Sequence, residues 1–188
     1  GEVISIEESR TAMGSTDTFV VIASDGRQEP WEGLQIPHCE TKDDFIKAVR
    51  DSGLVGLGGA SFPTHVKFNP ANLDECDTLI VNGAECEPFI TSDHRNMLEH
   101  TDDIISGIRL TMKYLGLSKC YVGIENNKPD AIEKIRNGLK EIKGAEVVEL
   151  RSTYPQGAER VLIHETAGKT LKAGQLPASA GCILSNVT

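Results

Sequence analysis

The stretch KCYVGIENNKPDAIEKIRNGLKEIKGAEVVEL, residues 119–150, decides the fold. It begins with KCYVGIE at 119–125 and ends with AEVVEL at 145–150, and each of these short segments is predicted to be a strand. Between them, 128–142 carries apolar residues at helical spacing and is predicted to be a helix. Because two parallel strands need a long crossover connection, this order predicts a strand–helix–strand unit with parallel strands.

The same alternation extends on both sides of this unit. A buried strand is predicted at 77–83, a helix with a capping start at 101–116, and a further helix at 156–168. Upstream, TKDDFIKAVRDSG at 41–53 is predicted to be a helix that begins at an N-cap threonine and stops at a glycine. The whole pattern predicts an α/β domain, with a parallel sheet flanked by helices.

The first 36 residues have a different character. The runs EVISI and TFVVIAS are rich in β-branched residues, and Asp25-Gly26 is a turn signal. A few strands cannot make an independent domain, so we interpret 1–36 as the remnant of a small β module. The α/β domain is then expected to occupy 37–188.

Composition excludes several classes of protein. The chain has 188 residues, with 28 acidic and 19 basic side chains and a formal net charge of −9. That balance argues against a nucleic-acid partner, whose phosphates require cationic contacts. No apolar run approaches the roughly 18 residues of a membrane span. The sequence starts with Gly and has no signal-peptide pattern, so we expect a segment of a longer, cytoplasmic protein.

Neither a metal site nor a catalytic nucleophile is predicted. The five cysteines are odd in number, widely spaced and without any C-x-x-C pair, which excludes a self-contained zinc ribbon or ferredoxin-like motif within this chain. We expect them to be reduced. The histidines His65, His94 and His164 lack the spacing of metal ligands, and Cys86 has no paired base.

The glycine-rich segment GLVGLGGASFPTHVK, residues 53–67, matches neither familiar phosphate-binding motif. A Rossmann fingerprint would follow a strand and end in glycine, and a Walker loop would need Gly-Lys-Ser/Thr. Even so, Gly56, Gly58 and Gly59 would let backbone N–H groups approach an anion closely.

The residues that follow the glycines could complete an anion site. Pro63 suits the first turn of a helix that starts near Phe62, and the N-terminus of such a helix favours a phosphate. Lys67 could add a full positive charge. The alternative, which the pattern leaves equally open, is a surface turn that binds nothing.

Two further segments leave predicted strands at the edge of the sheet where open α/β folds bind ligands. In VNGAECEPFITSDHR, 81–95, Asn82 offers an amide, and Glu85 and Glu87 could accept hydrogen bonds from hydroxyls. In STYPQGAER, 152–160, the residues that could approach a ligand are Tyr154, Gly157 and Glu159. The alternatives are a solvated acidic loop for 81–95, and for Glu159 simple complementation of a helix dipole.

Together, GLVGLGGASFPTHVKF, VNGAECEPFITSDHR, VGIENNKPDAI and TYPQGAER resemble the C subunit of the Rnf electron-transport complex. They are more distantly similar to the flavin- and NADH-binding subunit of respiratory complex I. Relatives of the Rnf protein also serve as electron carriers for amino-acid reductases such as proline reductase. The resemblance spans roughly residues 36 to 188, and its motifs occur in the family's order.

The resemblance implies a Rossmann-like α/β domain that holds FMN noncovalently, with NADH stacking on the flavin. The residues it assigns to FMN are Gly56, Gly58, Gly59, Lys67, Asn82, Glu85, Tyr154, Gly157 and Asn186. Those it assigns to NADH are Phe62, Glu87 and Glu159.

The sequence departs from the family pattern at three positions. Ser61 replaces a glycine, Leu57 replaces the arginine of complex I relatives, and Ala84 stands where those relatives have an acid. The family also continues beyond Thr188 into a β-grasp segment and a ferredoxin domain with 4Fe-4S clusters. Its N-terminal module is a barrel-sandwich, whose end the first residues resemble.

The function implied is an NADH-dependent oxidoreductase component. FMN accepts a hydride from NADH and passes single electrons to iron–sulfur clusters elsewhere in the protein or complex, without a catalytic side chain. Its partners would be other electron-transport subunits or a soluble reductase, which would place the chain in the cytoplasm or peripherally on the inner face of the membrane. Two alternatives remain: a scaffold protein without flavin, and a plain NAD-binding dehydrogenase domain.

Overall fold

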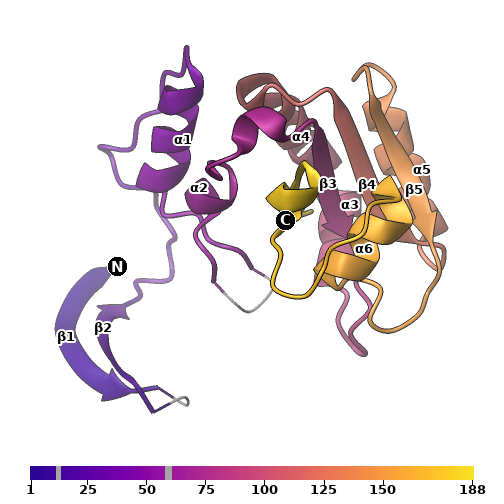
Figure 1. Ribbon diagram of the computed structural model, residues 1–188. Coiled ribbons are helices and arrows are strands. Elements are labelled where there is room, and N and C mark those ends of the chain that lie inside the picture. Colours follow the sequence, from indigo (N-terminus) through magenta and orange to yellow (C-terminus); the bar gives the residue numbers. More distant parts are fainter. Residues whose placement is uncertain (12–13, 58–60) are drawn as a thin grey trace. The chain divides into compact units, whose positions relative to one another are not determined.

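The computed structural model describes residues 1–11, 14–57 and 61–188, which fall into two compact units, Gly1–Pro37 and His38–Thr188 (Figure 1). The first unit is an antiparallel hairpin of β1 (Glu2–Arg10) and β2 (Thr16–Ala23), with a register irregularity between Val3 and Ser5. Most of its side chains are exposed. Whether this hairpin belongs to a barrel-sandwich module stays a prediction.

The second unit contains a parallel sheet with the strand order β5-β4-β3-β6. Its strands are β3 (Thr78–Gly83), β4 (Lys119–Glu125), β5 (Ala145–Leu150) and β6 (Cys182–Asn186). The predicted α/β fold class is confirmed. Strand β6 is not among the strands predicted from the sequence, although its run of three apolar residues is as long as that of β3.

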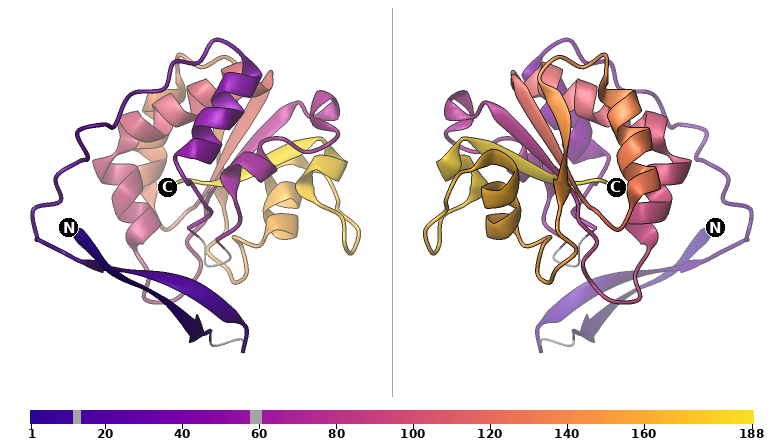
Figure 2. Two further views of the ribbon diagram at one scale, coloured as in Figure 1. Left: turned by 90° about the vertical axis from the view of Figure 1, so that its left-hand side faces the viewer. Right: turned by 90° about the vertical axis from the view of Figure 1, so that its right-hand side faces the viewer.

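Helices cover both faces of the sheet. They are α1 (Lys42–Asp51), α2 (Thr64–Lys67), α3 (Ser92–Glu99), α4 (Thr101–Leu115), α5 (Pro129–Leu139) and α6 (Glu159–Ala167), with short 3₁₀ turns η1 (Leu73–Glu75) and η2 (Pro177–Ala180). Helices α3, α4 and α5 lie on one face and α6 on the other (Figure 2). Because a strand points alternate side chains to opposite faces, Leu79 and Val81 pack with α4, whereas Ile80 packs with α6.

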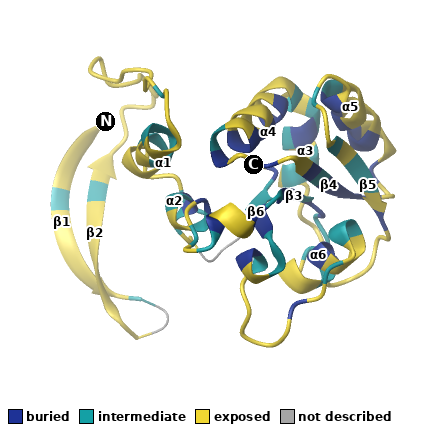
Figure 3. Ribbon diagram, turned by 45° about the horizontal axis from the view of Figure 1, so that its top comes forward, coloured by how far each residue is buried: buried dark blue, intermediate teal, exposed yellow. Residues whose placement is uncertain are grey.

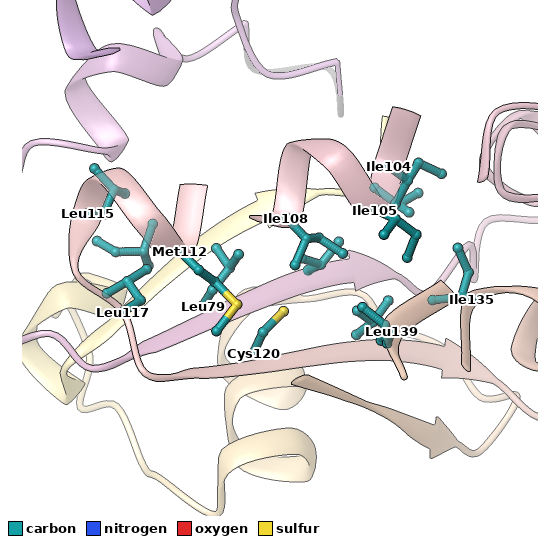
Figure 4. Packing of buried hydrophobic residues seen from close by; sticks show 14 of the residues in the cluster. Leu79, Ile104, Ile105, Ile108, Met112, Leu115, Leu117, Cys120, Ile135 and Leu139 are labelled. Atoms are coloured by element: carbon teal, nitrogen blue, oxygen red, sulfur yellow. The ribbon is translucent and has the colours of Figure 1, made fainter. Parts of the chain in front are cut away.

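The core lies mainly between the sheet and helices α4 and α5 (Figure 3). Ile108 and Met112 of α4 and Ile135 of α5 are buried together with Leu79 and Cys120 of the strands (Figure 4). Burial raises the pKa of the Cys120 thiol to about 12, so this cysteine behaves as a small apolar core residue. The core thus fixes the strand ends that carry the site.

Three local predictions are tested by the structure, and two of them are corrected. The segment 81–95 is not all loop, because α3 begins at Ser92. Thr101 does not cap α4: it is the first residue of that helix, whose N-cap is His100, and its hydroxyl donates to the Met97 carbonyl at 2.6 Å. Helix α1, by contrast, has the predicted cap: Thr41 and Asp44 bond reciprocally, and Gly53 follows with a left-handed φ of 70°.

Within the described residues, no helix combines the length and apolar character needed to cross a membrane.

Candidate functional site

The glycine loop is closed by a short antiparallel stem. The Gly56 N–H donates to the Phe62 carbonyl at 2.8 Å, and the Thr64 N–H donates to the Leu54 carbonyl at 3.1 Å. A Cβ added to Gly56 would come no nearer than 3.6 Å to the Phe62 carbonyl oxygen, an ordinary contact. Nothing described within the chain therefore requires glycine at position 56. The other two predicted loop glycines, Gly58 and Gly59, lie outside the described residues.

Lys67 ends α2, which is a single turn. Pro63 is its N-cap rather than part of its first turn, so the predicted helix starting near Phe62 begins later, at Thr64. A four-residue helix has almost no macrodipole, so its N-terminus is not a phosphate site. The positive charge here is that of Lys67, whose Nζ lies 3.7 Å from Glu159 Oε1 and 6.0 Å from the centre of the Phe62 ring.

Asn82, near the end of β3, joins two loops. Its Nδ2 donates to the Gly157 carbonyl at 3.1 Å, and its Oδ1 accepts from the Ala84 N–H at 3.1 Å. A Cβ on Gly157 would lie 2.8 Å from the Ala84 carbonyl oxygen, so only glycine fits this approach. The loop after β5 thus reaches past β4 to the end of β3 and is held there.

Glu85 caps helix α3. Its carboxylate accepts from the N–H groups of Asp93 at 2.8 Å and His94 at 3.2 Å, and from the Ser92 hydroxyl at 3.2 Å. The helix has no side-chain bond from its own N-cap residue, so Glu85 supplies the missing acceptor from outside the helix. This structural role was not predicted, because α3 itself was not.

Asn186 lies beside Asn82, at the end of β6. The two residues are register partners of the parallel β3–β6 pair. Asn186 Nδ2 donates to Asp93 Oδ2 at 3.1 Å, and its Oδ1 accepts from the Thr188 N–H at 2.8 Å. The end of β6 is therefore bonded to the start of α3.

A cavity of about 800 Å³ opens between α2, the helix α4 and the ends of β3 and β6. Its apolar wall includes Ile104 and Ile108 of α4 and Leu79 of β3. The structure brings seven of the predicted site residues to this large cavity: Gly56, Phe62, Lys67, Asn82, Gly157, Glu159 and Asn186. The departures Leu57 and Ser61 also line it.

The other described site residues, Glu85, Glu87 and Tyr154, line a separate cavity of about 360 Å³. An ion pair lies at its wall, with Lys128 Nζ 2.6 Å from Glu125 Oε2 and side chains that are only 8% and 2% exposed. Lys128 also donates to Asn127 at 3.1 Å, so this buried charge is well partnered.

His94 of α3 also lines this small cavity. Its Nε2 lies 2.9 Å from Asp130 Oδ1, in the first turn of α5. The hydrogen bond from His94, with a second from the Ala131 N–H, lowers the pKa of the Asp130 carboxyl. Asp130 is therefore an ionised partner for the imidazole. The sequence pattern around His94 predicts no such role for it.

Comparison with known proteins places these motifs in a family. Residues 49–188 match the Nuo51 FMN-binding domain. The chain is 42% identical over 171 residues to the C subunit of the proton-translocating ferredoxin:NAD(+) oxidoreductase complex of Clostridium ljungdahlii, covering 89% of this chain and 37% of that protein. It is 40% identical over 193 residues to the C subunit of the Na(+)-translocating ferredoxin:NAD(+) oxidoreductase complex of Acetobacterium woodii, covering 100% and 43%.

Among solved structures, an NAD+-reducing [NiFe]-hydrogenase in the H2-reduced state is similar, with a TM-score of 0.62 and 25% identity over 78% of this chain and 29% of that one. The chain spans about two fifths of the length of the two C subunits from Clostridium ljungdahlii and Acetobacterium woodii. The resemblance expected from the four motifs is confirmed. Because the family match covers most of its length, the chain belongs to the Nuo51 FMN-binding domain family.

Proposed function

We propose that this chain binds FMN in the large cavity and is the part of an electron-transfer oxidoreductase that accepts electrons from NADH. One observation carries the proposal: in a member of an FMN-binding domain family, seven residues predicted from sequence motifs converge on a single cavity. Its volume, about 800 Å³, lies in the range of cofactor sites.

The chemistry of the cavity wall fits a flavin. The apolar side chains of Leu79, Ile104 and Ile108 suit a flat ring system, whereas Asn82 and Asn186 place amide groups at one end. Lys67 supplies a cation for a phosphate, and no described contact within the chain explains the glycine at Gly56. A bound group that approaches the backbone at this point would explain it.

We assign the residues as follows. Gly56, with Gly58 and Gly59 by resemblance, would face the flavin through the backbone, and Lys67 would hold its phosphate or ribityl chain. Asn82 and Gly157 would shape the wall, since each already bonds to the other. Asn186 would close the end of the cavity. Glu85 and Tyr154 line the small cavity instead, so the contribution of Glu85 would come through its capping of α3.

NADH would approach from the side of Phe62 and Glu159, whereas Glu87, which the resemblance also assigns to NADH, lines the small cavity. FMN, when bound, supplies hydride and single-electron chemistry; the chain binds and orients the two ring systems. The exposed Phe62 ring offers a stacking surface, and Glu159 could accept from ribose hydroxyls. Since Glu159 pairs with Lys67, a phosphate that binds Lys67 would release this carboxylate for the dinucleotide.

The acceptors would be iron–sulfur clusters outside this chain, either in the rest of a longer protein or in partner subunits. The two curated relatives are named as subunits of ion-translocating ferredoxin:NAD(+) oxidoreductase complexes. We propose a similar assembly here, in which the chain is peripheral to the membrane. A soluble reductase is the alternative partner.

Titration of the purified chain with FMN, followed by quenching of flavin fluorescence, tests this function. We expect FMN to bind and the bound flavin to lose its absorbance on anaerobic addition of NADH. Lys67→Ala should weaken FMN binding about tenfold or more, as expected for the loss of a charged hydrogen bond. Lys172→Ala, an exposed lysine outside both cavities, should leave it unchanged.

Each alternative function predicts a different result. A scaffold protein without flavin would quench no fluorescence, even in a chain extended past Thr188. A plain NAD-binding domain would bind FMN equally with and without Lys67 but lose NADH binding in the Lys67→Ala variant. Either outcome would overturn the proposed function.

A further inference from the structure

The small cavity lies where the connections from two neighbouring strands diverge. Strand β4 leads into α5 on one face of the sheet, and its neighbour β5 leads into α6 on the other (Figures 1 and 2). The cavity is lined by Glu125, Asn127 and Lys128 after β4 and by Ser152 and Thr153 after β5. A crevice at the carboxyl ends of parallel strands is where open α/β sheets commonly place functional groups and ligands.

The walls of this cavity carry many groups that can exchange protons or relay them. Hydroxyls come from Thr91, Ser152, Thr153 and Tyr154. The titratable groups that line the cavity with His94 are Glu85, Cys86, Glu87, Glu125, Lys128 and Tyr154. The helix of His94 carries Asp93 and Arg95 on either side of it in sequence, and the packed helix α5 carries Asp130, which contacts the imidazole, and Lys134, which bonds to the Leu98 carbonyl. Such a wall suits water and proton transfer better than an apolar ligand.

The two cavities are separated by a thin wall. Cys86, which lines the small cavity, accepts a hydrogen bond at Sγ from the N–H of Gly157, which lines the large one, with 3.5 Å between N and Sγ. Glu85 and Glu87 flank Cys86 and face the small cavity. A proton released at the wall of the large cavity would therefore have to cross only the segment 84–87 to reach polar groups on the other side.

His94 and Asp130 connect the small cavity to solvent. The His94 side chain lines the cavity and is 25% exposed, whereas its partner Asp130 is 55% exposed and lies outside the lining. The Asp130 carboxylate orients the imidazole through Nε2, in the manner of acid–base pairs in which a carboxylate fixes the histidine ring. An imidazole is also the side chain whose ordinary charge change falls between pH 5 and 8.

The proposed function creates a need for such a group. NADH gives up a hydride, which is one proton with two electrons. When those two electrons leave singly for two one-electron acceptors of the iron–sulfur class, NAD+ and one proton remain. For each NADH oxidised, one proton must therefore leave the site.

We propose that His94, held by Asp130, carries this proton from the small cavity to solvent. The proposal rests on the proposed function. It assigns His94 a role as proton carrier rather than as a contact to FMN. The neutral imidazole of His94 accepts the proton from the small cavity. The proton then passes to solvent on the side where Asp130 is exposed.

Stopped-flow oxidation of the NADH-reduced chain by ferricyanide, a one-electron acceptor, tests the proposal across pH 5–9. In the wild-type chain, the rate of oxidation by ferricyanide should fall as the pH drops through the range where an imidazole becomes protonated. A protonated His94 cannot accept a further proton. His94→Gln should be at least about tenfold slower at pH 7, the low end of acid–base contributions, and should lose this inflection. Free imidazole should restore the rate of His94→Ala. His164→Gln, an exposed histidine outside both cavities, is the matched control.

A second measurement does not depend on turnover. The ring resonances of His94, identified from the His94→Gln spectrum, should titrate at different pH in the oxidised and reduced FMN-bound chains, whereas those of His164 should not. An unchanged pH profile in His94→Gln, no rescue by imidazole, or identical titrations in both states would overturn the proposal alone. Failure of the unchanged chain to bind FMN or accept a hydride would overturn the proposed function and this proposal with it.

Discussion

Residues 54–57 and 61–67 near the glycine loop and the segment 82–94 both supply residues to the candidate site, but the chain holds them in different ways. In 82–94, Asn82 and Glu85 are bonded within the protein, to Gly157, Ala84 and the start of α3. Around the glycine loop, Gly56 meets no steric constraint from the described chain, and Lys67 has a long, partly exposed ion pair and lies 6.0 Å from the centre of the Phe62 ring. The family motifs thus include residues that stabilise the folded site and residues whose contacts within the chain are few, as expected of ligand contacts. Stability measurements on variants distinguish the two kinds.

Asn82→Ala should give the largest loss of stability. It leaves the Gly157 carbonyl and the Ala84 N–H without their partner in a partly buried place, and each such loss costs about 1–3 kcal/mol. We expect the free energy of unfolding in urea to fall by about 2 kcal/mol. Asn137→Ala, at an exposed position on α5, should stay within about 0.5 kcal/mol. Equal stability of the two variants would show that Asn82 does not hold the loops together.

Glu85→Ala should have the next largest effect. Removal of the cap from α3 should cost about 1–2 kcal/mol, as with other helix caps. The loss should be local, so the amide protons of Asp93 and His94 should exchange faster with solvent. Glu133→Ala, an exposed acid on α5, serves as the control. Unaltered exchange at Asp93 and His94 would assign Glu85 to the ligand instead of the helix.

Most of the α/β unit could be predicted because its elements carry local signals. Helices α4 and α5 have apolar stripes, β3 and β4 contain short runs of apolar residues, and β5 carries the β-branched pair Val147 and Val148. Helix α3 lacks such a signal: among its residues only Met97 is buried, and its capping acceptor comes from Glu85, outside the helix. Strand β6 has a run of three apolar residues, as β3 does, but its place in the sheet comes from pairing with β3, which is distant in sequence. Both elements therefore depend on tertiary contacts that no local pattern records.

The candidate site was predictable as a set of residues but not as an arrangement. The motifs identified Asn82, Gly157, Lys67 and Glu159, yet the bond between the first two and the ion pair between the last two join distant parts of the chain. The division of the predicted residues between two cavities likewise follows from the wall at Ala84 and Gly157, which only the folded chain forms.

Ser61→Gly should have a smaller effect of opposite sign. Ser61 has a left-handed φ of 48°, a conformation that costs a non-glycine residue about 1 kcal/mol and that explains the glycine expected here from the family pattern. We expect the free energy of unfolding to rise by up to about 1 kcal/mol. The greater conformational entropy of glycine in the unfolded chain offsets part of this gain. Ser52→Gly, at a right-handed φ of −70°, should lower stability instead. A loss of stability in both variants would contradict this account of Ser61.

Gly56→Ala should change stability least and ligand binding most. The added methyl group finds room within the chain, so the free energy of unfolding should stay within about 0.5 kcal/mol of the unchanged protein. If FMN lies against this backbone, the methyl group should intrude on it and weaken binding about tenfold or more, an overpacking cost of about 1–3 kcal/mol. Gly144→Ala is the converse control: its Cβ would lie 2.2 Å from the Ser118 carbonyl oxygen, so it should destabilise the fold while the protein that remains folded binds FMN normally. Undiminished affinity in stable Gly56→Ala would move the flavin away from the glycine loop.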